Sequence, residues 1–157
     1  MAKRTIRLST DEILRKKCRP VKEITPSVLT LLDDMYETMT DANGVGLAAP
    51  QVGILKRVVV IDIGEGKIEL INPEVTLAEG SQVGDEGCLS IPGATAKVDR
   101  PDHVIVSALD RFGNPIQVEG KGLLARALCH ETDHLDGILY IDKAMDDEIF
   151  LPTEEED

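Results

Sequence analysis

Five consecutive residues, His130-Glu131-Thr132-Asp133-His134, match the pattern H-E-x-x-H. On a helix, two imidazoles four residues apart lie on one face and can bind a single metal ion. Glu131 lies one residue further round, where its carboxylate can take a proton from a water molecule on that metal. The pattern therefore indicates a metal-dependent hydrolytic site. The alternative is a structural cluster, in which two histidines beside a buried acid are simply hydrogen-bonded.

Such a site needs a third protein ligand, because a catalytic tetrahedral metal has three protein ligands and one open position. Metalloproteases of the extended type supply another His six residues after the second one, and Tyr140 occupies that position here. Cys88 is the better candidate, since its thiol lies between glycine-bearing turns at the end of a predicted sheet. The alternative is that Cys88 is a small buried side chain, as free cysteines often are.

The other two thiols are weaker candidates. Cys129 adjoins His130 but points about 100° away round the helix. Cys18 lies in a basic N-terminal segment without turn residues. We expect both in the core or on the surface. Three cysteines at irregular spacing also argue against a disulfide framework.

Small residues and glycines dominate residues 44–53, which follow the first predicted helix. Glycines there would let the backbone approach another group closely. The Lys-Ser/Thr end of a phosphate-binding loop is missing. If the segment faces the metal, the side-chain amide of Gln51 can donate a hydrogen bond to a developing oxyanion. The alternative is a tight connection between a helix and a strand.

The elements that position these residues are short. Thr25-Pro26 begins an amphipathic helix that Asn43-Gly44 ends, and a second helix is predicted from Gly122 to Leu135. Between them lie β-branched runs separated by turn signals, at residues 57–62, 67–72, 103–110 and 116–119. This order predicts an α+β fold with short antiparallel or mixed sheets. The simplest partition is one catalytic domain, residues 1–150, followed by an acidic tail, residues 151–157.

Charge limits the classes of partner. The 157 residues carry 29 acidic and 17 basic side chains, a formal net charge of -12. Residues 1–22 hold eight bases against two acids, a local +6, so the rest carries -18. Most of the surface would repel a phosphate backbone, and we expect no direct DNA binding. No apolar stretch reaches the roughly 18 residues of a membrane span, and no secretory signal is evident, so we expect a cytoplasmic protein.

Three segments in this order and spacing resemble those of peptide deformylases: GVGLAAPQ at 44–51, EGCLS at 86–90 and HETDH at 130–134. Residues 11–20, LINPE at 70–74 and Arg100-Pro101 are similar as well. The resemblance implies a metal-dependent hydrolase that removes the formyl group from the N-terminal formylmethionine of newly made polypeptides. It also implies that the sheets pack around a central C-terminal helix carrying H-E-x-x-H, with the amphipathic helix near the N-terminus.

By the same resemblance, one divalent metal ion would be bound by Cys88, His130 and His134. Glu131 would be the general base and then the acid, and Gln51 and the backbone N–H of Leu89 would hold the oxyanion. One thiolate and two imidazoles suit zinc or ferrous iron. The family favours Fe²⁺ in the cell, with Zn²⁺, Ni²⁺ or Co²⁺ as substitutes.

The resemblance places the substrate as well. The peptide would bind as an added β-strand along Val45, Gly46 and Gly87. Its methionine side chain would enter a pocket lined by Val45, Leu123, Ala127 and His130.

Two departures and one charge pair bear on the surroundings of the site. Many members have Gln where this chain has Cys129, and some have Arg where it has Thr95. We expect Glu86 and Arg100 to form an ion pair that steadies the segment before Cys88. The basic N-terminal segment leaves a transient ribosome contact open. A zinc endoprotease and a non-catalytic metal-binding module are the alternatives to deformylation.

Overall fold

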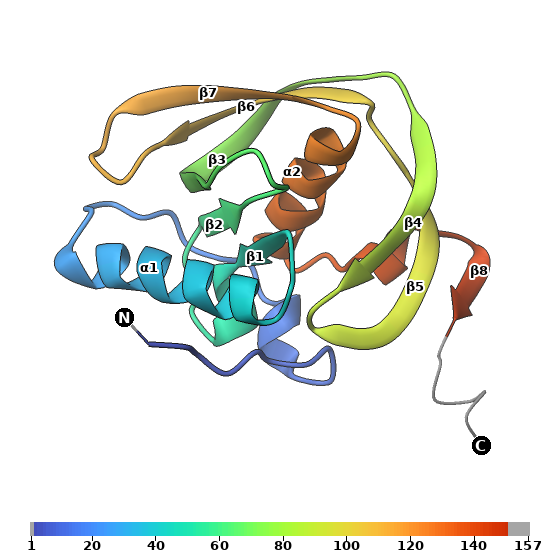
Figure 1. The fold of residues 1–157 in the computed structure, drawn as a ribbon, viewed down its shortest axis with the longest axis horizontal. Coiled ribbons are helices and arrows are strands. Elements are labelled where there is room, and N and C mark those ends of the chain that lie inside the picture. The colour runs from blue at the N-terminus through green and yellow to red at the C-terminus, as the bar shows by residue number, and fades with distance from the viewer. Residues whose placement is uncertain (1, 151–157) are drawn as a thin grey trace.

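The computed structural model describes residues 2–150, and the predicted acidic tail, 151–157, lies outside them. Two antiparallel sheets and two α-helices make up the fold, which confirms the predicted α+β class (Figure 1). The helices are α1 (Pro26–Asp41) and α2 (Leu123–His134), with 3₁₀ turns η1 (Glu12–Arg15), η2 (Ala49–Val52) and η3 (Tyr140–Lys143).

The larger sheet has five strands in the order β1-β2-β3-β6-β7, and the smaller has three in the order β4-β5-β8. Figure 1 shows α2 between the two sheets, and α1 beside β1 and β2. The strands are β1 (Gly46–Ala48), β2 (Val58–Ile61), β3 (Ile68–Glu79), β4 (Gln82–Cys88), β5 (Ile91–Arg100), β6 (His103–Leu109), β7 (Pro115–Lys121) and β8 (Ala144–Phe150).

Strand β2 is apolar at every position because both of its faces are buried. Val59 and Ile61 pack with Leu128 of α2 in one core cluster. Val58 and Val60 belong to the cluster on the other face, which contains the buried side of α1. The five-stranded sheet therefore packs against α2 on one face and against α1 on the other, which sets the distance between the two helices.

Two sequence interpretations were wrong. Asn72-Pro73 does not end a strand, because β3 continues through it with an irregular register beside β6. Asn72 adopts a left-handed conformation there, and its amide binds both the N–H and the carbonyl of Val21. Cys88 also does not lie between two turns, since β4 runs to Cys88 and only Leu89 and Ser90 form the turn into β5.

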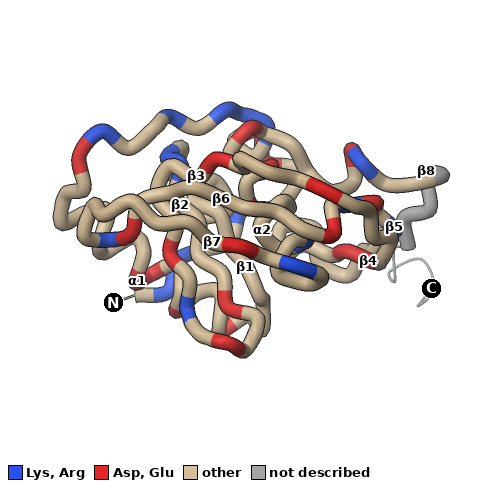
Figure 2. The backbone as a smooth tube through the Cα atoms, turned by 90° about the horizontal axis from the view of Figure 1, so that it is seen from above, with Lys and Arg blue, Asp and Glu red and all other residues tan. Residues whose placement is uncertain are grey.

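Basic residues follow one another along the segment before α1, as Figure 2 shows at one edge of the molecule. That segment is fixed to the fold by its backbone. The N–H of Arg19 donates to the carbonyl of Leu55, and the N–H of Arg57 donates to the carbonyl of Arg19. Within residues 2–150, no helix is both long enough and apolar enough to span a membrane.

Candidate metal centre and cavity

Three potential metal ligands meet where the β4–β5 turn reaches α2. Cys88 is the last residue of β4, and His130 and His134 lie one turn apart on α2. One ligand atom from each lies within 4.8 Å of the other two, and Cys88 Sγ is 3.4 Å from His134 Nε2. Both histidines are buried, and Cys88 is half-buried. Cys88 therefore forms one cluster with two histidines that lie far from it in the sequence.

The donor set suits a divalent cation. His134 Nδ1 is buried without a hydrogen-bond partner in the described part of the chain. Burial, and then the charge of His130, lower the pKa of His134, so its ring is neutral and free to bind a metal. For His130, burial opposes protonation, but the charge of Glu131 and the hydrogen bonds with Cys88 and Glu86 outweigh it and raise the pKa to about 10. These surrounding anionic groups favour a positive charge at the centre of the cluster.

Glu86 joins the cluster to its surroundings. Its Oε1 accepts from His130 Nδ1 at 2.8 Å and from Arg100 Nη2 at 2.9 Å, while Oε2 accepts from Arg100 Nε at 2.7 Å and Arg126 Nη1 at 2.6 Å. The expected Glu86–Arg100 pair is thus confirmed. Burial opposes ionisation of Glu86, but hydrogen bonds from Arg100 and His130 hold its pKa at about 2. Because His130 donates through Nδ1 to this carboxylate, its Nε2 is left for a metal.

Glu131 is held beside the ligands in an apolar position. It is 4% exposed, its Oε1 has no partner among the described residues, and its Oε2 lies 3.9 Å from His130 Nε2. Burial raises the pKa of Glu131 to about 7. A carboxylate poised near neutrality can both accept and return a proton. Gly46 makes room for it, because a Cβ there would lie 2.5 Å from Glu131 Oε2.

Gln51 has a fixed orientation. Its Oε1 accepts the N–H of Ala48 at 2.9 Å, so its Nε2 must point the other way, toward Ser90 Oγ at 3.1 Å and Cys88 Sγ at 3.5 Å. The N-terminal segment supports both sides of this contact. The N–H of Arg7 donates to the carbonyl of Gln51, and the N–H of Ser9 donates to the carbonyl of Ser90. This support could not be predicted from the sequence, because backbone contacts depend little on side-chain type.

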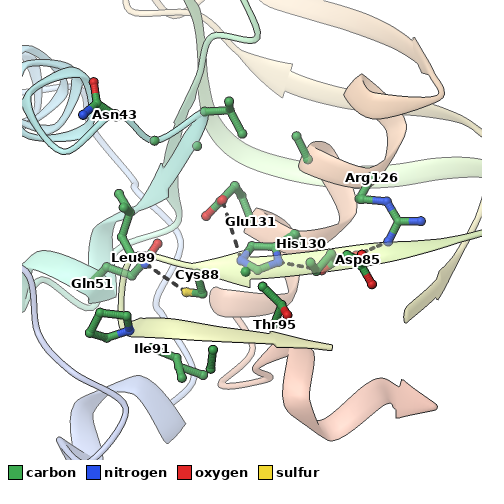
Figure 3. A pocket seen from close by; sticks show the side chains of 18 of the residues that line it. Asn43, Gln51, Asp85, Cys88, Leu89, Ile91, Thr95, Arg126, His130 and Glu131 are labelled. Carbon is green, nitrogen blue, oxygen red and sulfur yellow. Dashed lines mark hydrogen bonds and ion pairs between the residues drawn. The ribbon is translucent and has the colours of Figure 1, made fainter. Parts of the chain in front are cut away.

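A cavity of about 560 Å³ opens in front of these residues. All predicted site residues except His134, which is buried, line it: Val45, Gly46, Gln51, Gly87, Cys88, Leu89, Leu123, Ala127, His130 and Glu131 (Figure 3). Val45 and Leu123 keep 44% and 54% of their surface exposed, which is typical of an apolar binding site.

Several residues that line the cavity were not predicted as site residues from the sequence: Asn43, Asp85, Ile91, Pro92 and Arg126. Arg126 had one available signal, its position four residues before His130 on the same helix face. Thr95, noted only as a departure, also lines the cavity. The remaining thiols are core residues, as expected, since Cys18 and Cys129 pack in the cluster beneath α2. Burial raises the pKa of Cys18 to about 11 and also raises that of Cys129, so neither thiol is activated.

Residues 3–149 match the family model described as polypeptide deformylase. The chain is 56% identical over 158 residues to a peptide deformylase of Agathobacter rectalis, covering 99% of this chain and 100% of that one. It is 63% identical over 145 residues to a peptide deformylase of Acetivibrio thermocellus, covering 92% and 85% respectively.

Solved structures agree with the sequence relatives. The crystal structure of a peptide deformylase from Legionella pneumophila superposes with a TM-score of 0.89 at 47% identity, covering 92% of this chain and 87% of that one. A peptide deformylase from Synechococcus elongatus, solved in complex with actinonin, gives a TM-score of 0.87 at 41% identity, with 90% and 78% covered. The chain therefore belongs to the polypeptide deformylase family, the metal-dependent hydrolases that remove the formyl group from the N-terminal methionine of newly made polypeptides.

Proposed function

We propose that Cys88, His130 and His134 bind one divalent metal ion and that Glu131, Gln51 and Leu89 carry the hydrolysis of the formyl group. The observation that carries the proposal is the meeting of the three ligand atoms within 4.8 Å beside a buried carboxylate oxygen that has no hydrogen-bond partner within residues 2–150. A thiolate and two imidazoles leave a fourth position open, as catalytic sites of this type require.

We propose Fe²⁺ as the metal in the cell, with Zn²⁺, Ni²⁺ or Co²⁺ as substitutes. The Cys/His/His donor set suits both iron and zinc, and affinity alone favours zinc. The preference for iron rests on the family resemblance. Metal analysis of protein purified without oxygen tests it, and zinc as the main metal under those conditions would contradict it.

When bound, the ion polarises the formyl carbonyl and lowers the pKa of a water molecule. Glu131 accepts a proton from the water that attacks the formyl carbon, through Oε1, which has no hydrogen-bond partner among the described residues. As the C–N bond breaks, the same carboxyl group returns that proton to the departing nitrogen. The products are formate and a peptide with a free N-terminal amine.

Charge that develops on the formyl oxygen is met by Gln51 and by the backbone N–H of Leu89. The Nε2 group of Gln51 has two hydrogens, and the longer of its two contacts is the 3.5 Å contact to Cys88 Sγ. The formyl oxygen replaces that weak contact, while the bond to Ser90 Oγ is kept. Because Gln51 is already oriented by Ala48, little reorganisation accompanies the reaction.

The peptide binds between two sheet edges. Strand β1 is at one edge of the five-stranded sheet and β4 at one edge of the three-stranded sheet, and both contribute residues to the cavity. Val45, Gly46 and Gly87 offer backbone groups to an added strand. The methionine side chain enters the apolar part of the cavity near Val45, Leu123, Ala127 and His130.

The test compares formyl-Met-Ala-Ser with acetyl-Met-Ala-Ser as substrates of the metal-loaded protein and of Glu131→Gln. We expect turnover of the formyl peptide only, and a loss of about 10²–10⁴-fold in kcat/KM for Glu131→Gln with metal content unchanged. Equal turnover of the two peptides, or full activity of Glu131→Gln, would contradict the proposed roles.

Residues 1–150 are proposed to form one catalytic domain that works in the cytoplasm, where newly made polypeptides are its substrates. A transient ribosome contact is proposed for the basic edge before α1. Four cations there, Lys16, Lys17, Arg19 and Lys22, make no ion pair within residues 2–150, and neither does Lys56, which is paired with Arg19 through the backbone. The nearby Arg15 and Arg57 pair with Asp142 and Asp136.

A further inference from the structure

Arg126 is a buried cation on α2 that the reaction itself does not use. Its side chain is 10% exposed, and it lies one turn before His130. Nη1 donates to Glu86 Oε2 at 2.6 Å. The same guanidinium also donates to three backbone carbonyl oxygens of β4 and β5: Val98 at 3.1 Å, Gly84 at 3.4 Å and Gln82 at 3.1 Å.

Strand β4 has a glycine where this guanidinium lies. A Cβ on Gly84 would be 3.1 Å from Arg126 Nη2, which is closer than ordinary contact. The backbone at Gly84 has no positive φ, so its conformation does not demand glycine. The missing side chain is therefore explained by the room that Arg126 needs.

The contacts of Arg126 join the two elements that carry the proposed metal ligands. Cys88 is on β4, and His130 is on α2. On the other side of His130, Asp133 accepts from Arg100, which also holds Glu86. Hydrogen bonds therefore connect α2 to the β4–β5 hairpin both before His130, through Arg126, and after it, through Asp133. Of these two residues, Arg126 is the one that binds the strand backbone.

We propose that Arg126 is a positioning residue that sets the distance and orientation between Cys88 and His130. This inference rests on the ligand set proposed above. Arg126 fills the fourth acceptor position of Glu86, so that this carboxylate keeps His130 in one orientation. By binding the carbonyls of Gln82 and Gly84, Arg126 also fixes the position of β4 along the axis of α2. A guanidinium is suited to this role, because its planar donors can serve several acceptors at once.

The test uses Co²⁺-loaded protein, whose visible absorption reports the coordination geometry, and the rate of Co²⁺ release to a chelator. Arg126→Met keeps the apolar stem and removes the donors. We expect its Co²⁺ bands to shift and its release rate to rise by up to roughly 10-fold. This is less than the 10- to 100-fold loss of metal affinity that follows removal of a direct partner of a ligand, because Arg126 acts through Glu86. Arg126→Lys should give an intermediate result, because an ammonium cannot bind all four acceptors in the same geometry.

Two further variants separate positioning from general stability. Arg111→Met removes a comparable ion pair with Glu69 and Asp33 outside the cavity, and it should lower stability without altering the bands. Gly84→Ala displaces the guanidinium without removing its charge, and it should shift the bands in the same direction as Arg126→Met. It also serves as the test if Arg126→Met does not fold.

Cys88→Ser distinguishes the inference from the ligand set on which it rests. If Cys88→Ser leaves the Co²⁺ spectrum unchanged, the proposed ligand set is wrong. If Cys88→Ser abolishes the thiolate band but the Arg126 and Gly84 variants behave like Arg111→Met, the ligand set stands and the role of Arg126 is overturned.

Discussion

At the scale of single residues, Cys88 is the proposed ligand that is least determined by helix geometry. His130 and His134 are brought together by the helical repeat, but Cys88 reaches them only through the β4–β5 hairpin. We expect Cys88→Ser to weaken metal binding by more than the roughly 10- to 100-fold that loss of an outer partner costs, because a thiolate ligand is replaced by a neutral hydroxyl. Metal content after dialysis measures this.

Cys129→Ser is the matched control for that prediction. Cys129 packs in the core beneath α2, so the new hydroxyl should reduce stability by about 1–3 kcal/mol and leave metal content unchanged. The opposite pattern, with metal lost from Cys129→Ser and kept by Cys88→Ser, would show that the wrong thiol has been assigned.

The sequence was informative about residues whose chemistry is rare and uninformative about those that act through common contacts. His130, Glu131 and Cys88 could be singled out because their types and spacing are unusual. Ser90 and Arg126 could not, since a serine or an arginine fits many surfaces, and only the fold brings them to Gln51 and Glu86. The Glu86–Arg100 pair was expected from resemblance, whereas the further bond from Arg100 to Asp133 needed the structure.

At the scale of elements, the approach of β1 to α2 is the tightest contact at the site. A Cβ on Gly46 would lie 2.5 Å from Glu131 Oε2, and β1 is held by β2, so the strand cannot retreat. We expect Gly46→Ala to displace the carboxylate and lower kcat/KM by about 10²-fold while metal content is unchanged. Steady-state kinetics on formyl-Met-Ala-Ser with metal analysis measures both.

Gly44→Ala provides the comparison for that change. Its Cβ would meet the end of the Leu89 side chain at 2.7 Å, and a flexible side chain can rotate away. The loss of activity should therefore be smaller than for Gly46→Ala. Equal effects of the two substitutions would mean that the contact with Glu131 is not what requires glycine.

His103 links three strands and should make stability depend on pH. Its Nδ1 lies 2.9 Å from Glu79 of β3 and its Nε2 lies 2.5 Å from Glu119 of β7. Hydrogen bonds to Glu79 and then Glu119 raise the pKa of His103 above its usual 6.5. Because the pKa of His103 is higher in the folded state than in the unfolded state, its protonation stabilises the fold. This stabilisation is complete below about pH 6.5 and is lost as the pH rises through the pKa of the folded state.

His103→Gln removes this titration. We expect the urea concentration at the unfolding midpoint to be higher for wild type than for the variant. The difference should be largest at mildly acid pH and should shrink as the pH rises above about 6.5. A difference that is constant across this range would show that His103 contributes packing and neutral hydrogen bonds rather than charge.

Element prediction failed where polarity and burial do not follow a simple period. β2 and β6 were found because their runs of β-branched residues are buried on one or both faces. β4, with the sequence QVGDEGC, was missed since its buried position is the charged Glu86, which is stabilised by Arg100 and Arg126. Asn72-Pro73 suggested a turn because the tertiary contact with Val21 that stabilises the left-handed Asn72 has no local signature.

At the scale of the whole molecule, the distribution of charge sets one edge apart. The chain has a net charge of -12. Yet Lys16, Lys17, Arg19, Lys22 and Lys56, which is paired with Arg19 through the backbone, make no ion pair within residues 2–150. Three of them, Arg19, Lys22 and Lys56, line a groove of about 700 Å³ together with Glu23, Thr25 and apolar residues. The groove and the cavity beside the candidate metal centre share no lining residues, so an occupant of the groove need not cover that cavity.

This arrangement predicts a weak, salt-sensitive attachment to the ribosome, whose RNA supplies the phosphates. Lys16→Glu combined with Lys17→Glu should reduce co-sedimentation with ribosomes at low salt and flatten its dependence on salt, because fewer counterions are released on binding. Turnover of free formyl-Met-Ala-Ser should not change, since neither lysine lines the cavity.

Replacing Lys67 and Lys121, which lie outside this edge, with Glu gives the same change in net charge. If that control reduces sedimentation equally, the effect comes from net charge alone, and if wild type does not sediment with ribosomes at low salt, the basic edge has another role.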